Sequence, residues 1–195
     1  MRPVFWFDFN SPFVYLAAER IDPLIPDAEW RPFAFPLMLG AQGRLEEAMG
    51  RDPHAAIEAA SGRIAERGLP PLALPAGWPA ATWSLHPLRA AVYADEQGRM
   101  REFVRVAYRR FCAEGLVLSE VANLRAAAEA AGLDPDAVLD AIERPDIKQR
   151  VKDNTDAAIA RGLPGIPTVE VGGELVWGDD RLDEAAALAE RADGH

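Results

Sequence analysis

Ser11 stands where a buried strand would turn into a helix, and its hydroxyl could take part in chemistry there. Residues 4–9 are almost all apolar or aromatic, which predicts a strand covered on both faces. Asn10–Pro12 then supplies turn and N-cap residues and a proline suited to a first helical turn, and Phe13 opens an apolar stripe at helical spacing. A hydroxyl at such a helix start lies where backbone N–H groups favour an anion.

The same position also suits a purely structural role. A serine before a helical proline is commonly an N-cap whose oxygen accepts a backbone N–H, which contributes roughly 1 kcal/mol to stability. From this stretch alone, both interpretations of Ser11 stay open.

A second group of candidate residues lies near the other end of the chain. Gly165–Thr168 enters a predicted strand through a proline, which is commonly only a stiff entry point, and cis X–Pro bonds are only about 5–6% of cases. Gly178 precedes two acids that open the predicted last helix. Asp179 and Asp180 are equally well explained as an N-cap with a first-turn acid and as ligand-binding residues.

The composition excludes some classes of partner. The chain has 195 residues and a formal net charge of −10, which argues against nucleic acid and anionic membranes, because these need clustered Lys and Arg. No run approaches the roughly 20 apolar residues of a membrane span, and no small-residue cleavage site follows the apolar N-terminal segment. We therefore expect a cytoplasmic protein with one domain, or one domain with a large insertion.

The single cysteine and three histidines suggest neither a disulfide nor a metal site. Cys112 cannot form an internal disulfide, and its place in a helical pattern predicts a buried structural thiol. His54 follows a helix-start proline and is predicted to lie on the surface, His86 lies at a helix start, and His195 is terminal. None has a partner at metal-ligand spacing, so we predict no metal.

The predicted elements follow the order β-α-β, a long helical region, then α-β-β-α, which suits a mixed sheet flanked by helices. Periodicity and Gly and Pro breaks predict strands at 4–9, 29–36, 165–171 and 174–177, and helices at 12–22, 44–50, 53–67, 84–97, 99–114, 120–131, 136–143, 147–161 and from 178 onward. The proline-rich stretch 69–81 is predicted to be an ordered, non-helical connection. Short breaks between the central helices predict a bundle.

This order is that of thioredoxin-like domains, in which a loop with a cis proline faces the start of the first helix. The resemblance implies an α/β thioredoxin-like fold of the DsbA and kappa-class type with a large all-helical insertion. The thioredoxin-like domain would span about 1–38 and 146–195, and the insertion about 39–145. Ser11 and Val14 stand in place of the two cysteines of a Cys-x-x-Cys motif, which disfavours a disulfide oxidoreductase.

More narrowly, the chain resembles the glutathione-dependent 2-hydroxychromene-2-carboxylate isomerases, which are related to kappa-class glutathione transferases. Motifs in matching order carry this resemblance over essentially the whole chain: Phe7–Pro12 followed by Tyr15–Ala17, Gly165–Thr168 and Trp177–Leu182. The resemblance implies glutathione as the cofactor, a homodimer, and reversible isomerisation of 2-hydroxychromene-2-carboxylate to trans-o-hydroxybenzylidenepyruvate. The reaction would proceed by thiolate addition, rotation about the resulting single bond and elimination of the thiolate.

Carried over residue by residue, the resemblance implies that Ser11 contacts the sulfur of bound glutathione and is not itself a nucleophile. A thiol near pKa 8.5 is mostly protonated at neutral pH, and a hydroxyl donor at a helix start favours its anion. The backbone of Ile166, beside a cis Pro167, would pair with the cysteinyl part of the tripeptide. The γ-glutamyl end would be held by Asp180, with Asp179 and Arg181.

An aromatic acid as substrate needs an apolar slot and a cation. Phe13, Phe35, Met38 and Trp83 are candidates to line the slot, although such residues are also typical of a core.

The family usually carries an Asn and a Lys after the second strand, whereas residues 39–67 offer neither. Arg44 or Arg51 could replace the missing cation as the carboxylate partner. The bidentate geometry of arginine differs from the point charge of lysine, so the substrate could differ as well.

Two alternatives stand beside the isomerase. One is a kappa-class-like glutathione transferase, which would consume glutathione by forming a stable conjugate. The other is a non-catalytic thioredoxin-like binding module, which would keep the fold without the chemistry. Binding of glutathione, and its consumption during turnover, would separate the three.

Overall fold

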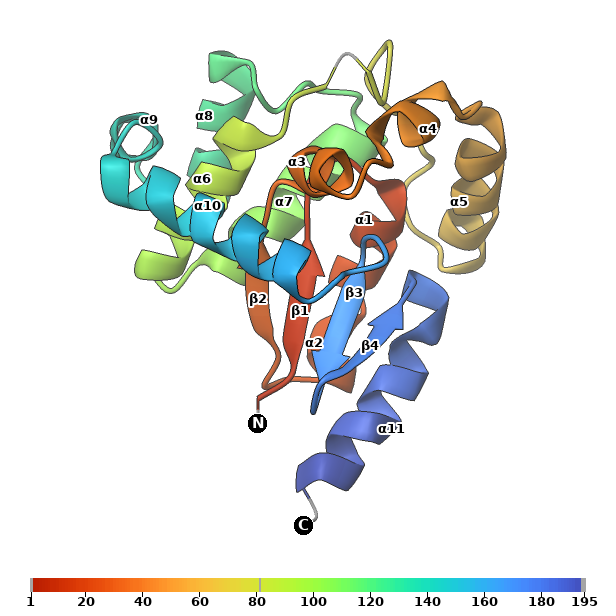
Figure 1. Cartoon of the computed structure of the whole chain (residues 1–195). Helices are drawn as coiled ribbons and strands as arrows, with labels where there is room; N and C mark the ends of the chain where they lie inside the picture. The colour runs from red at the N-terminus through yellow and green to blue at the C-terminus, as the bar shows by residue number, and fades with distance from the viewer. Residues whose placement is uncertain (1, 81, 194–195) are drawn as a thin grey trace.

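A mixed sheet forms the centre of the molecule (Figure 1). The computed structural model describes residues 2–80 and 82–193. The four strands of the sheet lie in the order β2-β1-β3-β4, with bounds β1 (Val4–Phe7), β2 (Glu29–Pro32), β3 (Thr168–Val171) and β4 (Glu174–Trp177). β1 is parallel to β2 and antiparallel to β3, which is antiparallel to β4.

The helices confirm the predicted order of elements. Their bounds are α1 (Pro12–Ala18), α2 (Ile21–Leu24), α3 (Phe35–Ala41), α4 (Leu45–Gly50), α5 (His54–Glu66), α6 (Leu85–Glu96), α7 (Met100–Ala113), α8 (Val121–Ala130), α9 (Pro135–Ala141), α10 (Pro145–Ala160), the 3-10 turn η1 (Asp179–Arg181) and α11 (Leu182–Asp193). The stretch 69–80 contains no helix or strand, as predicted, and Ala81 lies outside the described residues. No helix in the described part of the chain combines the length and the hydrophobicity that a membrane span requires.

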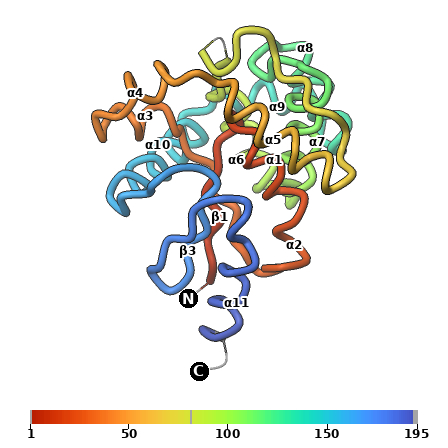
Figure 2. Tube along the Cα trace, turned by 90° about the vertical axis from the view of Figure 1, so that its right-hand side faces the viewer, coloured from red at the N-terminus to blue at the C-terminus, as the bar shows by residue number. Residues whose placement is uncertain are grey.

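The helices divide between the sides and one end of the sheet. α6 to α10 pack against one another beside β2, which confirms the predicted bundle, and α11 packs beside β3 and β4 (Figure 1). In both views α3, α4 and α5 lie beyond the C-terminal end of β1 (Figure 2). The chain therefore surrounds that end of the sheet with helices, close to Ser11 at the start of α1.

β1 is buried on both faces, as its apolar sequence predicts. On one face Phe5 and Phe7 pack against Trp30 of β2, with ring centroids 4.9 and 5.9 Å apart. β2 is an edge strand, in agreement with the two prolines, Pro32 and Pro36, of the predicted strand 29–36.

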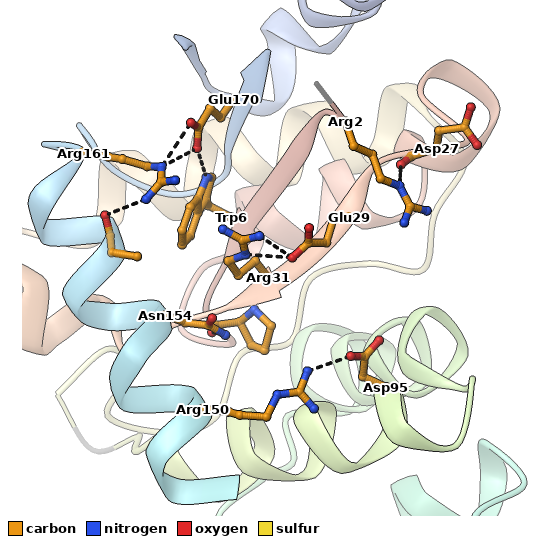
Figure 3. Close-up of polar contacts among 12 residues, drawn as sticks. Arg2, Trp6, Asp27, Glu29, Arg31, Asp95, Arg150, Asn154, Arg161 and Glu170 are labelled. Atoms are coloured by element: carbon orange, nitrogen blue, oxygen red, sulfur yellow. Dashed lines mark hydrogen bonds and ion pairs between the residues drawn. The ribbon is translucent and has the colours of Figure 1, made fainter. Parts of the chain in front are cut away.

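On the other face of β1, Trp6 lies among charged side chains (Figure 3). The guanidinium carbons of Arg31 and Arg161 lie 4.9 and 5.4 Å from the centre of its ring. Its indole N–H donates to Glu170 at 3.0 Å, and Glu170 also pairs with Arg161 at 2.9 Å. These residues come from β1, β2, β3 and the end of α10, so the contacts tie that helix to the sheet.

The predicted strands 4–9 and 165–171 are shorter in the structure, at Val4–Phe7 and Thr168–Val171, and two other predicted elements differ more. The helix predicted at 12–22 is interrupted after Ala18, because in a continuous helix the ring of Pro23 would clash with the carbonyl of Glu19. The strand predicted at 29–36 ends at Pro32.

The end of that strand is replaced by α3, which begins at Phe35 with Pro36 in its first turn, where a missing N–H costs nothing. The N–H groups of Ala34 and Phe35 are satisfied by side chains of distant residues, Thr155 at 3.0 Å and Asp8 at 2.8 Å. Long-range contacts therefore stabilise the helix start.

Candidate functional site

Ser11 is the N-cap of α1 by position, but its side chain makes no capping hydrogen bond. Its backbone is extended, with φ −148° and ψ 127°, and the residue is 8% exposed. The two interpretations of Ser11 made different predictions about this hydroxyl. The absence of a capping bond in the described structure favours a role outside helix stability.

Ser11 lines a cavity of about 220 Å³ at the end of the sheet. The walls come from α1, α3, α4, the connection before α6, the segment before β3, and the end of β4. They include Phe13, Phe35, Leu45, Met49, Trp78 and Ile166. The structure therefore brings Ser11 and Ile166, 155 positions apart in the sequence, into one mostly apolar cavity.

A second hollow, of about 360 Å³, adjoins this cavity. Phe13, Ile166 and Trp177 line both spaces. The Ile166–Pro167 peptide bond is cis, as the family resemblance implied. The second hollow ends at charged residues of η1 and α5, so charged side chains lie beside the apolar walls that the two spaces share.

Trp177 lies directly against the backbone before the cis bond. A Cβ added to Gly165 would come within 2.7 Å of the indole nitrogen, so only a glycine leaves room for the ring in this position. The indole is 49% exposed, although it is large and apolar. Gly165 therefore allows Trp177 to form the wall between the two spaces.

Asp179 forms a buried ionic contact between η1 and α5. The residue is 1% exposed, and its carboxylate binds Arg63 and, at 2.9 Å, Arg67. Arg67 also donates to the carbonyl of Leu16 in α1 at 3.3 Å. Both carboxylate oxygens of Asp179 are taken by arginines, so the geometry favours a structural role over the predicted contact with glutathione.

Asp180 and Arg181 lie on the exposed side of the same turn and line the second hollow. The side chain of Asp180 is 56% exposed and lies 3.2 Å from Arg63. The guanidinium carbon of Arg63 is 5.5 Å from the ring centre of Phe13. Arg181 pairs with Glu184 at 2.6 Å. Positive and negative groups therefore alternate around this hollow.

Arg44 and Arg51, the two candidates for the missing cation, both line the first cavity. Arg44 is half-buried and donates to Gln42 at 2.8 Å and to the carbonyl of Pro164 at 3.0 Å. Among the described residues it has no carboxylate partner. Arg51 is 69% exposed and pairs with Glu47 at 2.5 Å. Arg44 is therefore the better placed of the two to bind a carboxylate in the cavity.

The four residues predicted for the aromatic slot divide into two pairs. Phe13 and Phe35 line the cavity. Met38 is fully buried in the core, because it lies on the inner face of α3, and Trp83 is 69% exposed and lines a separate, smaller hollow.

Sequence reasoning missed other parts of the wall. Trp78 and Pro79 come from the proline-rich connection, and Leu45 and Met49 come from α4. The tryptophan beside a proline was the available signal, but a stretch without periodicity does not predict which direction its side chains take.

Asp8 and Cys112 are buried titratable groups that line neither space. Burial raises the pKa of Asp8 to about 6, although hydrogen bonds from Ser84 and from the backbone of Phe35 and Asn10 partly oppose this. Burial also raises the pKa of the Cys112 thiol far above its usual range. Cys112 is fully buried, which confirms the prediction of a buried thiol and makes it a poor nucleophile.

Comparison with known proteins gives consistent matches over nearly the whole chain. A family model described as the DSBA-like thioredoxin domain matches residues 4–189. A 2-hydroxychromene-2-carboxylate isomerase of Sphingobium xenophagum is 32% identical over 186 residues, covering 92% of this chain and 93% of the relative. One from Pseudomonas sp. (strain C18) is 29% identical over 189 residues, covering 91% and 85%.

Solved structures show the same fold. A 2-hydroxychromene-2-carboxylate isomerase structure matches with a TM-score of 0.80 and 24% identity, covering 98% of this chain and 95% of that one. A probable DsbA oxidoreductase from Streptomyces coelicolor matches with a TM-score of 0.75 and 19% identity, covering 100% and 91%. At these identities, the structural matches establish the thioredoxin-like fold. The reaction has to be inferred from the residues of the site.

Proposed function

The chain belongs to the DSBA-like thioredoxin domain family and, within it, to the 2-hydroxychromene-2-carboxylate isomerase family, and from this premise we propose its function. The protein is an isomerase that interconverts 2-hydroxychromene-2-carboxylate and trans-o-hydroxybenzylidenepyruvate, with glutathione as its cofactor. The observation that carries the proposal is the hydroxyl of Ser11, which makes no capping bond and lies in one cavity with Ile166.

The two adjoining spaces suit a tripeptide with an uncharged middle and charged ends. Ile166 and Trp177 line both spaces and would contact the cysteinyl part. Asp180 would bind the γ-glutamyl ammonium group, and Arg181 would bind a carboxylate. Asp179 would hold the turn that carries these two residues, through its contacts with α5.

Within this arrangement, the hydroxyl of Ser11 would donate a hydrogen bond to the sulfur of bound glutathione and so favour the thiolate. When bound, glutathione supplies a thiolate that can add reversibly to a conjugated ketoacid, which allows a former double bond to rotate. The apolar walls around Ser11 limit the access of water, and this strengthens the interaction between the hydroxyl and a negative charge.

The substrate would lie in the first cavity. Phe13 and Phe35 provide aromatic walls for its ring, and Arg44 provides a cation for its carboxylate. Gln42 and Pro164 hold the guanidinium of Arg44 in place, so little side-chain entropy is lost when a carboxylate binds.

The family also leads us to propose a homodimer in the cytoplasm. A single buried cysteine without a disulfide is compatible with a reducing compartment. Light scattering coupled to size exclusion would check the dimer, and a mass near 21.3 kDa would contradict it.

Ultraviolet monitoring of 2-hydroxychromene-2-carboxylate, with and without glutathione, tests the proposed function. We expect conversion that requires glutathione and leaves its concentration unchanged. Falling glutathione would indicate a transferase. If the protein neither converts the substrate nor binds glutathione in calorimetry, it is a thioredoxin-like binding module without the enzymatic activity.

A further inference from the structure

Asp8 is a buried acid at the end of β1 whose carboxylate joins three separate segments. One oxygen accepts the backbone N–H of Asn10 at 3.2 Å, and the other accepts the backbone N–H of Phe35 at 2.8 Å. The hydroxyl of Ser84, at the start of α6, also hydrogen-bonds to the carboxylate. Asp8 is 0% exposed and does not line either space of the site.

Two of the segments that Asp8 joins line the first cavity. Asn10 and Ser11 line it from the turn before α1, and Phe35 lines it from the start of α3. The side chain of Asn10 also accepts a hydrogen bond from Thr82 at 2.7 Å, which connects the turn to the segment before α6. The distance between the Ser11 hydroxyl and the Phe35 ring therefore depends on contacts that meet at one carboxylate.

We propose that Asp8 is a positioning residue, whose ionised carboxylate fixes the Ser11 turn against the Phe35 wall and so makes the geometry of the site depend on pH. The consequence for ligand binding rests on the proposed function, because it assumes that the cavity holds glutathione and an aromatic acid. The positioning itself is a property of the free protein.

The surroundings of Asp8 support this role. Burial raises its pKa to about 6, and the groups that lower it are uncharged: the Ser84 hydroxyl and backbone N–H groups. The phenol of Tyr108, from α7, donates to the backbone carbonyl of Asp8, and burial raises the pKa of this tyrosine well above its usual range. Of these groups only Asp8 titrates between about pH 5 and 7, and its ionised form opposes folding. Because the buried acid lowers the stability of the fold, a role in the geometry of the site explains its presence better than a role in stability.

Amide chemical shifts in the free protein test the positioning. We expect the amide signals of Asn10, Ser11 and Phe35 to titrate together with a midpoint near pH 6. The isosteric variant Asp8→Asn should abolish this titration. Ser84→Ala should move its midpoint upward, because the Ser84 hydroxyl lowers the pKa of Asp8.

Binding of S-methylglutathione, which has no titrating thiol, tests the effect on the site. We expect its affinity in the wild type to rise about three- to tenfold from pH 5 to pH 7.5, and to be flat and low in Asp8→Asn. Thr155→Val is the matched control, because Thr155 is buried and accepts the neighbouring N–H of Ala34 without titrating. It should lower stability and leave the pH dependence of binding unchanged.

Two results would overturn the proposal. The first is amide signals of Asn10, Ser11 and Phe35 that do not titrate, or that titrate equally in Asp8→Asn. The second is an S-methylglutathione affinity with the same pH dependence in wild type and Asp8→Asn. If S-methylglutathione does not bind the wild type at any pH, the result contradicts the proposed glutathione-dependent function and not the role of Asp8. The amide titration still tests that role.

Discussion

Ser11 carries the proposed chemistry through a hydroxyl that α1 does not use. Because no capping bond is lost, Ser11→Ala should change the free energy of unfolding by less than about 0.5 kcal/mol. Turnover should fall about 100-fold, the effect of removing one donor from a developing anion. Denaturant titration and the ultraviolet assay measure the two quantities.

Asp134 gives the matched control for that variant, because its side chain does cap a helix, accepting the N–H of Asp136 at 2.9 Å. Asp134→Ala should lose about 1 kcal/mol of stability and keep full turnover. A Ser11→Ala protein that loses stability but keeps its specific activity would show that Ser11 is an N-cap after all.

Arg44 is the second residue with a separable role. Arg44→Gln should raise KM for the carboxylate substrate about tenfold or more, because a charge-assisted hydrogen bond is lost, while a carboxamide analogue should be little affected. Arg51→Gln is the control, since Arg51 is exposed and already paired with Glu47. Equal effects of the two variants, or an equal effect on both substrates, would contradict a direct contact between Arg44 and the carboxylate.

At the scale of elements, the sequence predicted most of the fold because its signals are local. The last two strands, on either side of Gly172–Gly173, and the helices of the bundle appear within a few residues of their predicted bounds. The start of α3 was missed because Asp8 and Thr155, far away in the sequence, satisfy its first N–H groups. No local pattern reports such partners.

In the candidate site too, the sequence predicted what local motifs carry and missed what depends on distant residues. The motifs identified Ser11, Ile166 and the turn at Asp179–Arg181, and the structure brings these segments to two adjoining spaces. The burial of Asp179 could not be read from the sequence, because it depends on Arg63 in α5 and Arg67 just after it, both more than 100 positions away. For the same reason, the sequence did not separate the roles of Asp179 and Asp180.

The contact between η1 and α5 provides a prediction at this scale. Asp179→Ala should lower the free energy of unfolding by about 2–4 kcal/mol, because it leaves Arg67 without its acid and Arg63 with only the exposed Asp180 as a partner. Asp180→Ala should change stability by less than about 1 kcal/mol, because that side chain is 56% exposed, and should weaken glutathione binding. The reverse pattern, with Asp180 the stabilising residue, would overturn these assignments.

At the scale of the whole molecule, Asp8 should leave a signature in stability. Its folded-state pKa is raised from 3.8 to about 6, so the folded protein keeps a proton that the unfolded chain has released. Stability should therefore fall as pH rises from about 4 to about 6, by about 3 kcal/mol for a shift of about two pKa units. Surface acids whose pKa values are lowered, such as Glu47 and Asp136, change the stability of the protein at lower pH. Their effect should be the same in variants of Asp8.

Comparison of the wild type with Asp8→Asn isolates this effect, because all other groups titrate alike in the two proteins. We expect urea unfolding across pH 4 to 7.5 to show that the free energy of unfolding of Asp8→Asn increases relative to that of the wild type as pH rises. At neutral pH the variant should be at least as stable as the wild type. Ligand affinity should change in the opposite direction, since the ionised carboxylate that opposes folding also holds the cavity walls. If Asp8→Asn is less stable than the wild type by the same amount at every pH, Asp8 has only a structural role. Its ionisation would then not lower stability in favour of the geometry of the site.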